Sequence, residues 1–140
     1  MAEDIGDWKA FVMAGTRTGK LATTRADGRP HVVPVWFVVD ADDVVFTAGE
    51  DSVKGRAIAR DPRVCMCVDD ETPPFAFAML EGVASISRDV DELRRFATAI
   101  GGRYMGADRA AEFGTRNAVA EELLVRFTPA KVVARKHIAG

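Results

Sequence analysis

The sequence is poor in the residues that most often carry out chemistry themselves. Its 140 residues include only two cysteines, Cys65 and Cys67, and two histidines, His31 and His137. Two cysteines fall short of the four ligands of a structural zinc site, so no metal site is expected, and both are expected to be small core residues. No Cys–His, Ser–His–Asp, Walker or GxGxxG pattern occurs either. If the chain is an enzyme, its reactive atoms should belong to a cofactor, and no catalytic side chain is predicted.

Long apolar runs and an excess of positive charge are also missing. No run approaches the ~20 residues of a membrane-spanning helix, and the N-terminal stretch MAEDIGDWKAF lacks the layout of a signal peptide. A cytoplasmic protein without a membrane partner is therefore expected. The formal net charge of −2 argues against nucleic acid as the main partner. The length and the hydrophobic fraction of 48% predict a single globular domain over residues 1–140.

What the chain has instead is a series of short apolar stretches between turn residues. Residues 21–25 and 31–39 flank the turn signal Asp27-Gly28 and predict a hairpin. Further strands are expected at residues 44–47, 63–69, 75–87, 123–127 and 131–135, and helices at residues 4–14, 52–60, 90–100 and 107–120. Gly82 is expected to mark a bend. Six or seven antiparallel strands with few helices predict a mainly β fold, a closed or split barrel.

Pro34 lies inside one of these strands, where it cannot donate a hydrogen bond to a ladder. We therefore expect the strand to be at an exposed edge or to be bulged there. Trp36 lies two residues further and shares the face of Pro34. Its side chain is either buried in the core or supports a flat ligand across this edge. His31 is expected to be a partly exposed strand residue, with a ligand contact as the alternative.

The segment TAGEDSVKGRAIARDPRV, residues 47–64, places cations in the first turn of a helix. The N-terminus of a helix is positive and normally favours Asp or Glu, yet Lys54 and Arg56 follow the expected N-cap, Ser52. Outward-pointing amides, two cations and the small Gly55 together would suit a phosphate group. The alternative is local ion pairing of Lys54 and Arg56 with the acidic residues just before them, Glu50 and Asp51.

Three segments taken together, LATTRADGRPHVVPVWF, TAGEDSVKGRAIARDPRV and AMLEGVASI, resemble the pyridoxamine 5'-phosphate oxidase-like split-barrel superfamily. They are especially similar to its actinobacterial branch of deazaflavin (coenzyme F420)-dependent reductases. The resemblance spans residues 19–87. It implies an antiparallel split β-barrel of the FMN-binding type, assembled as a homodimer with two cofactors at the subunit interface.

The resemblance also implies roles for particular residues. The phosphate would be gripped by Thr47, Ser52, Lys54 and Arg56, and the ring system would lie along Pro34, Val35 and Trp36. Lys20 would meet the anionic tail of F420, and His31 is a further candidate contact. Two departures bear on the cofactor. Residues 31–37 contain no Lys or Arg, whereas oxidases of the family that use FMN usually carry basic residues there. Ala57 stands where many deazaflavin-dependent relatives have Asn.

The favoured hypothesis is an F420-dependent oxidoreductase that transfers a hydride from reduced F420 to a conjugated or quinone-like organic acceptor. Solvent could protonate the product, so no side chain is needed as an obligatory acid. Two alternatives stay open. One is an FMN-dependent oxidase or reductase of the pyridoxamine phosphate oxidase type. The other is a non-catalytic carrier that binds F420 or a tetrapyrrole.

Overall fold

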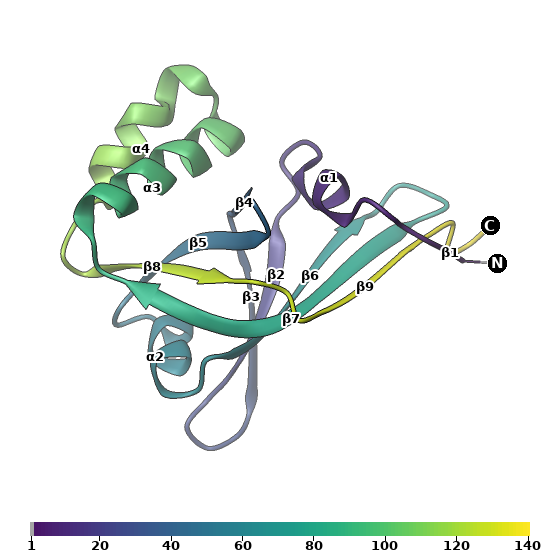
Figure 1. The fold of residues 1–140 in the computed structure, drawn as a ribbon, viewed down its shortest axis with the longest axis horizontal. Coiled ribbons are helices and arrows are strands. Elements are labelled where there is room, and N and C mark those ends of the chain that lie inside the picture. Colours follow the sequence, from purple (N-terminus) through teal and green to yellow (C-terminus); the bar gives the residue numbers. More distant parts are fainter. Residues whose placement is uncertain (1) are drawn as a thin grey trace.

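A curled antiparallel sheet dominates the computed structural model, which describes residues 2–140 (Figure 1). These residues form nine strands: β1 (Glu3–Asp4), β2 (Gly19–Thr24), β3 (Pro30–Val35), β4 (Val38–Asp40), β5 (Asp43–Gly49), β6 (Arg63–Asp70), β7 (Ala76–Ser87), β8 (Glu122–Phe127) and β9 (Lys131–Lys136). The strand order is β3-β2-β6-β7-β8-β5-β4, with β9 paired to β7 and to β1. The predicted mainly β, split-barrel fold class is confirmed.

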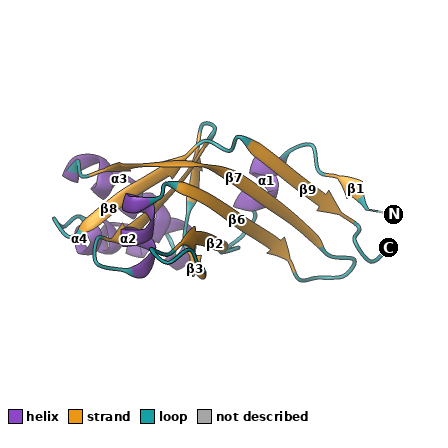
Figure 2. Cartoon of the chain, turned by 90° about the horizontal axis from the view of Figure 1, so that it is seen from below, coloured by secondary structure: helices purple, strands orange, loops and turns teal. Residues whose placement is uncertain are grey.

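The strand β7 joins the two halves of the sheet, and Figure 2 shows it running across the molecule. Its residues 76–81 pair with β9, whereas its residues 84–87 pair with β8. Gly82 lies where the partner changes, as expected of a bend position. A Cβ atom there would come within 2.8 Å of both the Phe127 ring and the carbonyl oxygen of Thr128. Close approach of β8 and the loop after it therefore requires glycine at this point.

Two apolar clusters lie on opposite faces of the β4–β5–β8 half of the sheet. The interior of the barrel holds the larger cluster, which includes the fully buried Phe37 and Phe46. The smaller one lies beneath α3 (Val90–Met105) and is formed by Val38, Val45, Leu93, Phe96, Ile100 and Leu124. Alternation along the strands produces this division, since Val44 and Phe46 point into the barrel while Val45 points to α3.

The remaining helices are α1 (Trp8–Met13), α2 (Val53–Arg60), the 3-10 helix η1 (Ala107–Arg109) and α4 (Ala110–Asn117). The start predicted for the first helix was four residues too early, because Asp7 accepts a hydrogen bond from the amide of Ala10 as the N-cap. The end predicted for the third was also wrong, since α3 continues through Gly101 and Gly102. A Cβ atom at Gly101 would lie 2.5 Å from the Cβ of Phe113, so this glycine lets α4 approach α3.

The predicted strand 31–39 is divided in the structure. β3 ends at Val35 and β4 begins at Val38, and between them the amide of Phe37 donates to the Tyr104 hydroxyl (3.3 Å). This division and the two-residue β1 raise the strand count of residues 2–140 to nine, above the six or seven predicted. The expectation for Pro34 is confirmed, because β3 is a terminal strand of the order and Pro34 is exposed.

Cys65 and Cys67 lie on the outer face of β6, so their prediction as core residues was wrong. Val64, Met66 and Val68 alternate with them and fill the barrel. Both thiols are free and half-buried, and burial raises the pKa of each above its usual value. Within residues 2–140, no group of His, Cys, Asp or Glu side chains is arranged to hold a metal ion, and no helix is long and apolar enough to span a membrane.

Candidate functional site

The turn from β5 into α2 brings a strand end and a helix N-terminus together. The Ser52 hydroxyl caps α2 as predicted: it accepts from the amide of Gly55 (3.0 Å) and donates to the carbonyl of Gly49 (2.7 Å). Gly55 is buried at this contact and does not leave open space for a ligand, which differs from the sequence-based expectation. A Cβ atom on Gly55 would meet the Gly49 carbonyl oxygen at well under 3.0 Å. Ser52 and Gly55 thus fix the position of the helix start.

The two predicted cations of α2 have different surroundings. Arg56 lies 3.5 Å from Asp51, with both side chains largely exposed, while Glu50 pairs with Arg88 at 2.7 Å. Lys54 is half-buried, and none of the ion pairs formed within residues 2–140 includes it. Local pairing with the preceding acidic residues therefore accounts for Arg56 but leaves the positive charge of Lys54 at the helix N-terminus available to an anion.

A carboxylate that the sequence analysis did not single out lies beside these groups. Glu122 stands opposite Gly49 in the β5–β8 ladder, and a Cβ atom added to Gly49 would lie 3.9 Å from its Oε2 and 4.0 Å from the Cβ of Ser52. Burial raises the pKa of Glu122, and the Thr47 hydroxyl and the Lys54 ammonium act in the opposite direction. Thr47, Lys54 and Glu122 therefore form one polar cluster at the end of β5.

Trp36 lies on the α3 side of the sheet, the side to which Thr47 and Glu122 also belong. Tyr104, on which its ring stacks, belongs to α3, and Thr47 follows Val45 on the strand face that α3 covers. The indole is 39% exposed and stacks on the ring of Tyr104, with centroids 5.0 Å apart and an interplanar angle of 8°. The hydroxyl of Tyr104 donates in turn to the carbonyl of Arg17 (2.7 Å). Tyr104 thus covers one face of the Trp36 ring, and Phe113 of α4 also packs against it, tilted by 59° with centroids 5.9 Å apart.

Two other predicted residues, Lys20 and Pro34, face each other across the β2–β3 ladder. Both belong to the outer face of the sheet, because Lys20 also stands opposite Cys67. The Lys20 ammonium pairs with Asp69 at 2.7 Å. The structure therefore brings these two together on a surface different from that of the Lys54 cluster.

The last two predicted residues point inward. Val35 is part of the buried barrel core. His31 stands opposite Thr23, and Nδ1 of His31 and Oγ1 of Thr23 are both buried without a hydrogen-bond partner among residues 2–140. Of the nine residues predicted from the sequence, the structure thus groups Thr47, Ser52, Lys54 and Arg56, whereas Trp36 lies apart from them against α3 and α4.

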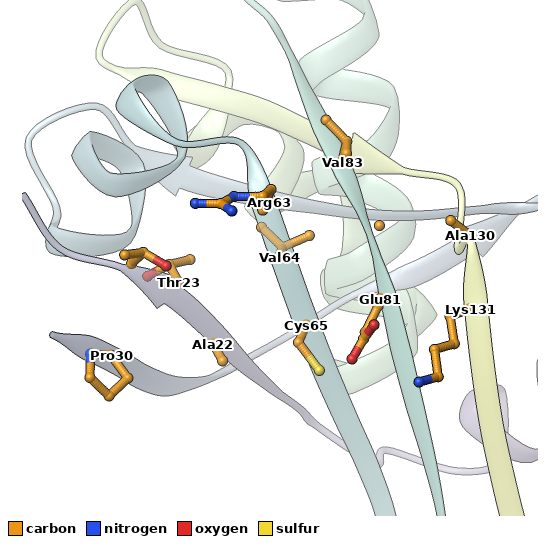
Figure 3. Close-up of a pocket in the computed structure, with 12 residues that line it drawn as sticks. Ala22, Thr23, Pro30, Arg63, Val64, Cys65, Glu81, Val83, Ala130 and Lys131 are labelled. Carbon is orange, nitrogen blue, oxygen red and sulfur yellow. The ribbon is translucent and has the colours of Figure 1, made fainter. Parts of the chain in front are cut away.

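A groove of about 550 Å³ crosses the outer face of the sheet (Figure 3). It is lined by Ala22, Thr23, Thr24, Pro30, Arg63, Val64, Cys65, Glu81, Gly82, Val83, Ala130 and Lys131. None of the predicted site residues contributes to it. Val83 within the groove is 64% exposed and the neighbouring Val32 is 66% exposed. This apolar outer face could have been inferred from the alternation in residues 63–68, had the cysteines been assigned outward.

Comparisons with known proteins agree with this architecture. A family model described as pyridoxamine 5'-phosphate oxidase matches residues 7–136. A conserved hypothetical protein of Mycobacterium tuberculosis has a similar structure, with a TM-score of 0.83 and 27% identity over 96% of this chain and 86% of that one. A solved F420 reductase matches with a TM-score of 0.71 and 25% identity, over 91% of this chain and 98% of its own.

A curated relative is similar over a shorter stretch. It is the 5a,11a-dehydrotetracycline/5a,11a-dehydrooxytetracycline reductase of Streptomyces rimosus, 43% identical over 56 residues. The matched stretch is 37% of this chain and 39% of that protein, so the likeness spans well under half of either.

Proposed function

Since this chain belongs to the pyridoxamine 5'-phosphate oxidase family, we propose that it is an oxidoreductase that uses reduced coenzyme F420 to reduce a conjugated or quinone-like organic acceptor. The observation that carries the proposal is Lys54 at a helix N-terminus, where it forms no ion pair within residues 2–140 and lies near Thr47 and Glu122. The similarity to a solved F420 reductase and to the 5a,11a-dehydrotetracycline/5a,11a-dehydrooxytetracycline reductase supports it.

The residues of this cluster fit an anionic, flat coenzyme. Lys54 and the first amides of α2 would hold its phosphate, with Ser52 fixing the helix start and Thr47 offering a hydroxyl. Trp36, supported from behind by Tyr104, would offer an aromatic surface to the ring system. When bound, the reduced coenzyme would supply the hydride. The protein would position the ring, and solvent would protonate the product.

A homodimer is part of this proposal, because much of the outer face is apolar and exposed. Val32 and Val83 are the most exposed apolar side chains there, at 66% and 64%. A surface of this kind normally marks an interface, and a second copy related by a two-fold axis is its simplest cover. The other expected partners are the coenzyme and the acceptor, and a cytoplasmic location stays part of the proposal.

Sedimentation at micromolar concentration tests the assembly. We expect a dimer for the wild type and dissociation for Val32→Asp, because a carboxylate buried at the interface would be left without a partner. Val90→Asp is the matched control. Val90 is also exposed (50%), but it lies at the start of α3 and does not belong to the outer face of the sheet. A monomeric wild type would contradict the proposed dimer.

A side-by-side titration with F420 and FMN tests the cofactor. We expect F420 to bind at least tenfold more tightly, a difference of about 1.4 kcal/mol. Both ring systems bury similar apolar area, so the difference in affinity should come from the phosphate-bearing tails. This difference should become smaller at high salt, because the contacts of the tails lie near solvent. Protein from a host without F420 should be colourless. Purification with a full complement of tightly held FMN would overturn the assignment.

A further inference from the structure

Glu122 is a negative group built into the anion-binding cluster of the proposed site. Its carboxylate lies over Gly49, next to the Ser52 cap and near Lys54 and Thr47. Any phosphate held at the start of α2 would therefore have this carboxylate as a neighbour. A group that contributes negative charge to a site meant for anions is not explained by phosphate binding alone.

We propose that Glu122 determines which phosphate the site accepts, by disfavouring a phosphomonoester dianion relative to a phosphodiester monoanion. The inference rests on the proposed function, since it concerns the same anion site. The phosphate of F420 joins two organic groups and carries one negative charge. The terminal phosphate of FMN is a monoester, and such groups lose a second proton near pH ~6. FMN is thus the more strongly repelled of the two ligands at neutral pH.

The other acidic groups near the start of α2 contribute less to the local potential than Glu122, because they are paired or exposed to solvent. Glu50 pairs with Arg88 at 2.7 Å, Asp51 lies 3.5 Å from Arg56 with both side chains largely exposed, and Glu121 is exposed. Lys54 is the cation that acts on Glu122 directly. One lysine facing one carboxylate leaves enough positive potential from the helix N-terminus for a monoanion but little for a dianion. Burial favours the protonated form of Glu122, so its pKa is raised, and the repulsion should grow as pH rises.

The test is a set of fluorescence titrations with FMN and with F420, on wild type, Glu122→Gln and the control Glu121→Gln. At a separation of roughly 6 Å in a water-like medium, one phosphate charge should cost about threefold in affinity and two should cost about tenfold. Glu122→Gln should therefore tighten FMN binding about tenfold and F420 binding about threefold near pH ~8, with the two gains converging near pH ~5.5 where FMN is a monoanion. Glu121→Gln should change neither affinity more than about twofold.

Urea unfolding of the same proteins gives a second readout that does not involve a ligand. The folded-state pKa of Glu122 is raised above 4.5, so the folded wild type loses stability as pH rises from 4.5 through the raised value. Glu122→Gln has no carboxyl to ionise there, so its free energy of unfolding should rise relative to that of the wild type over this pH range. Equal gains for FMN and F420 near pH ~8, or no gain for either, would overturn the inference while leaving F420 binding in place. If F420 binds neither the wild type nor Glu122→Gln, both the proposed function and this inference are wrong.

Discussion

Replacing Lys54 with alanine should weaken F420 binding by roughly 1.5–3 kcal/mol, the range for a hydrogen bond to a charged group. The free energy of unfolding should change much less, because Lys54 forms no ion pair within residues 2–140 and its attraction to Glu122 is its one charge interaction described above. Calorimetric titration at moderate salt measures the first quantity and urea denaturation the second. Together they separate loss of a ligand contact from loss of structure.

Arg60→Ala is the matched control for this variant. Arg60 lies on the same helix and carries the same charge, but its guanidinium donates to the carbonyl of Thr24 at the opposite end of α2. Removing it changes the net charge equally and should affect coenzyme affinity by less than about 0.5 kcal/mol. If wild type and Lys54→Ala bind F420 equally well, Lys54 does not contact the coenzyme and the anion site lies elsewhere.

The parts of the fold that the sequence predicted well are those with local causes. α2 begins after Ser52 and ends at Arg60, before the Asp61-Pro62 turn, as expected from the N-cap and the proline. The hairpin of β2 and β3 turns at Gly28, which adopts a positive φ of 86° as an Asp-Gly turn requires. In these cases the residues that specify the structure are neighbours along the chain.

The errors arose where a distant segment decides the structure. Gly101 and Gly102 are typical of a helix end. In the structure α3 continues through them, and the absence of side chains at these two positions lets α4 pack closely against α3. The predicted strand 31–39 is interrupted where the amide of Phe37 donates a hydrogen bond to the hydroxyl of Tyr104, a residue far along the chain, instead of to a neighbouring strand. Neither contact leaves a signal in the segment that it changes.

The same reasoning explains how much of the candidate site could be predicted. The proposed phosphate segment was recognisable because Ser52, Lys54 and Arg56 follow one another at the start of one helix. Glu122 could not be found this way, since it joins the cluster only through the pairing of β8 with β5. The stretch ELLVRF around it reads as an ordinary half-buried strand. A site residue that comes from a neighbouring strand can be predicted only when the order of the strands in the sheet is known, in addition to the sequence motif.

Gly55→Ala should destabilise the fold by about 3 kcal/mol, the upper part of the range for overpacking. Helix propensity predicts the opposite sign, because alanine is favoured over glycine by roughly 0.8–1 kcal/mol within helices. The steric term dominates here: the new Cβ atom would collide with the backbone carbonyl of Gly49 and lie 3.0 Å from the Ser52 hydroxyl oxygen. A backbone carbonyl cannot rotate away as a flexible side chain would, so the start of α2 would have to move.

Gly102→Ala tests whether the collision, rather than loss of a glycine, causes this effect. Its Cβ atom would lie 3.4 Å from the Cβ of Ala110, an ordinary contact, so propensity should decide the outcome. We expect thermal and urea unfolding to show Gly102→Ala between unchanged and about 1 kcal/mol more stable. Because the shift of α2 moves the amides next to Lys54, Gly55→Ala should also weaken F420 binding under conditions where it remains folded. A Gly55→Ala protein as stable as the wild type would show that the helix start is not held against Gly49, and the geometry proposed for the phosphate site would then be wrong.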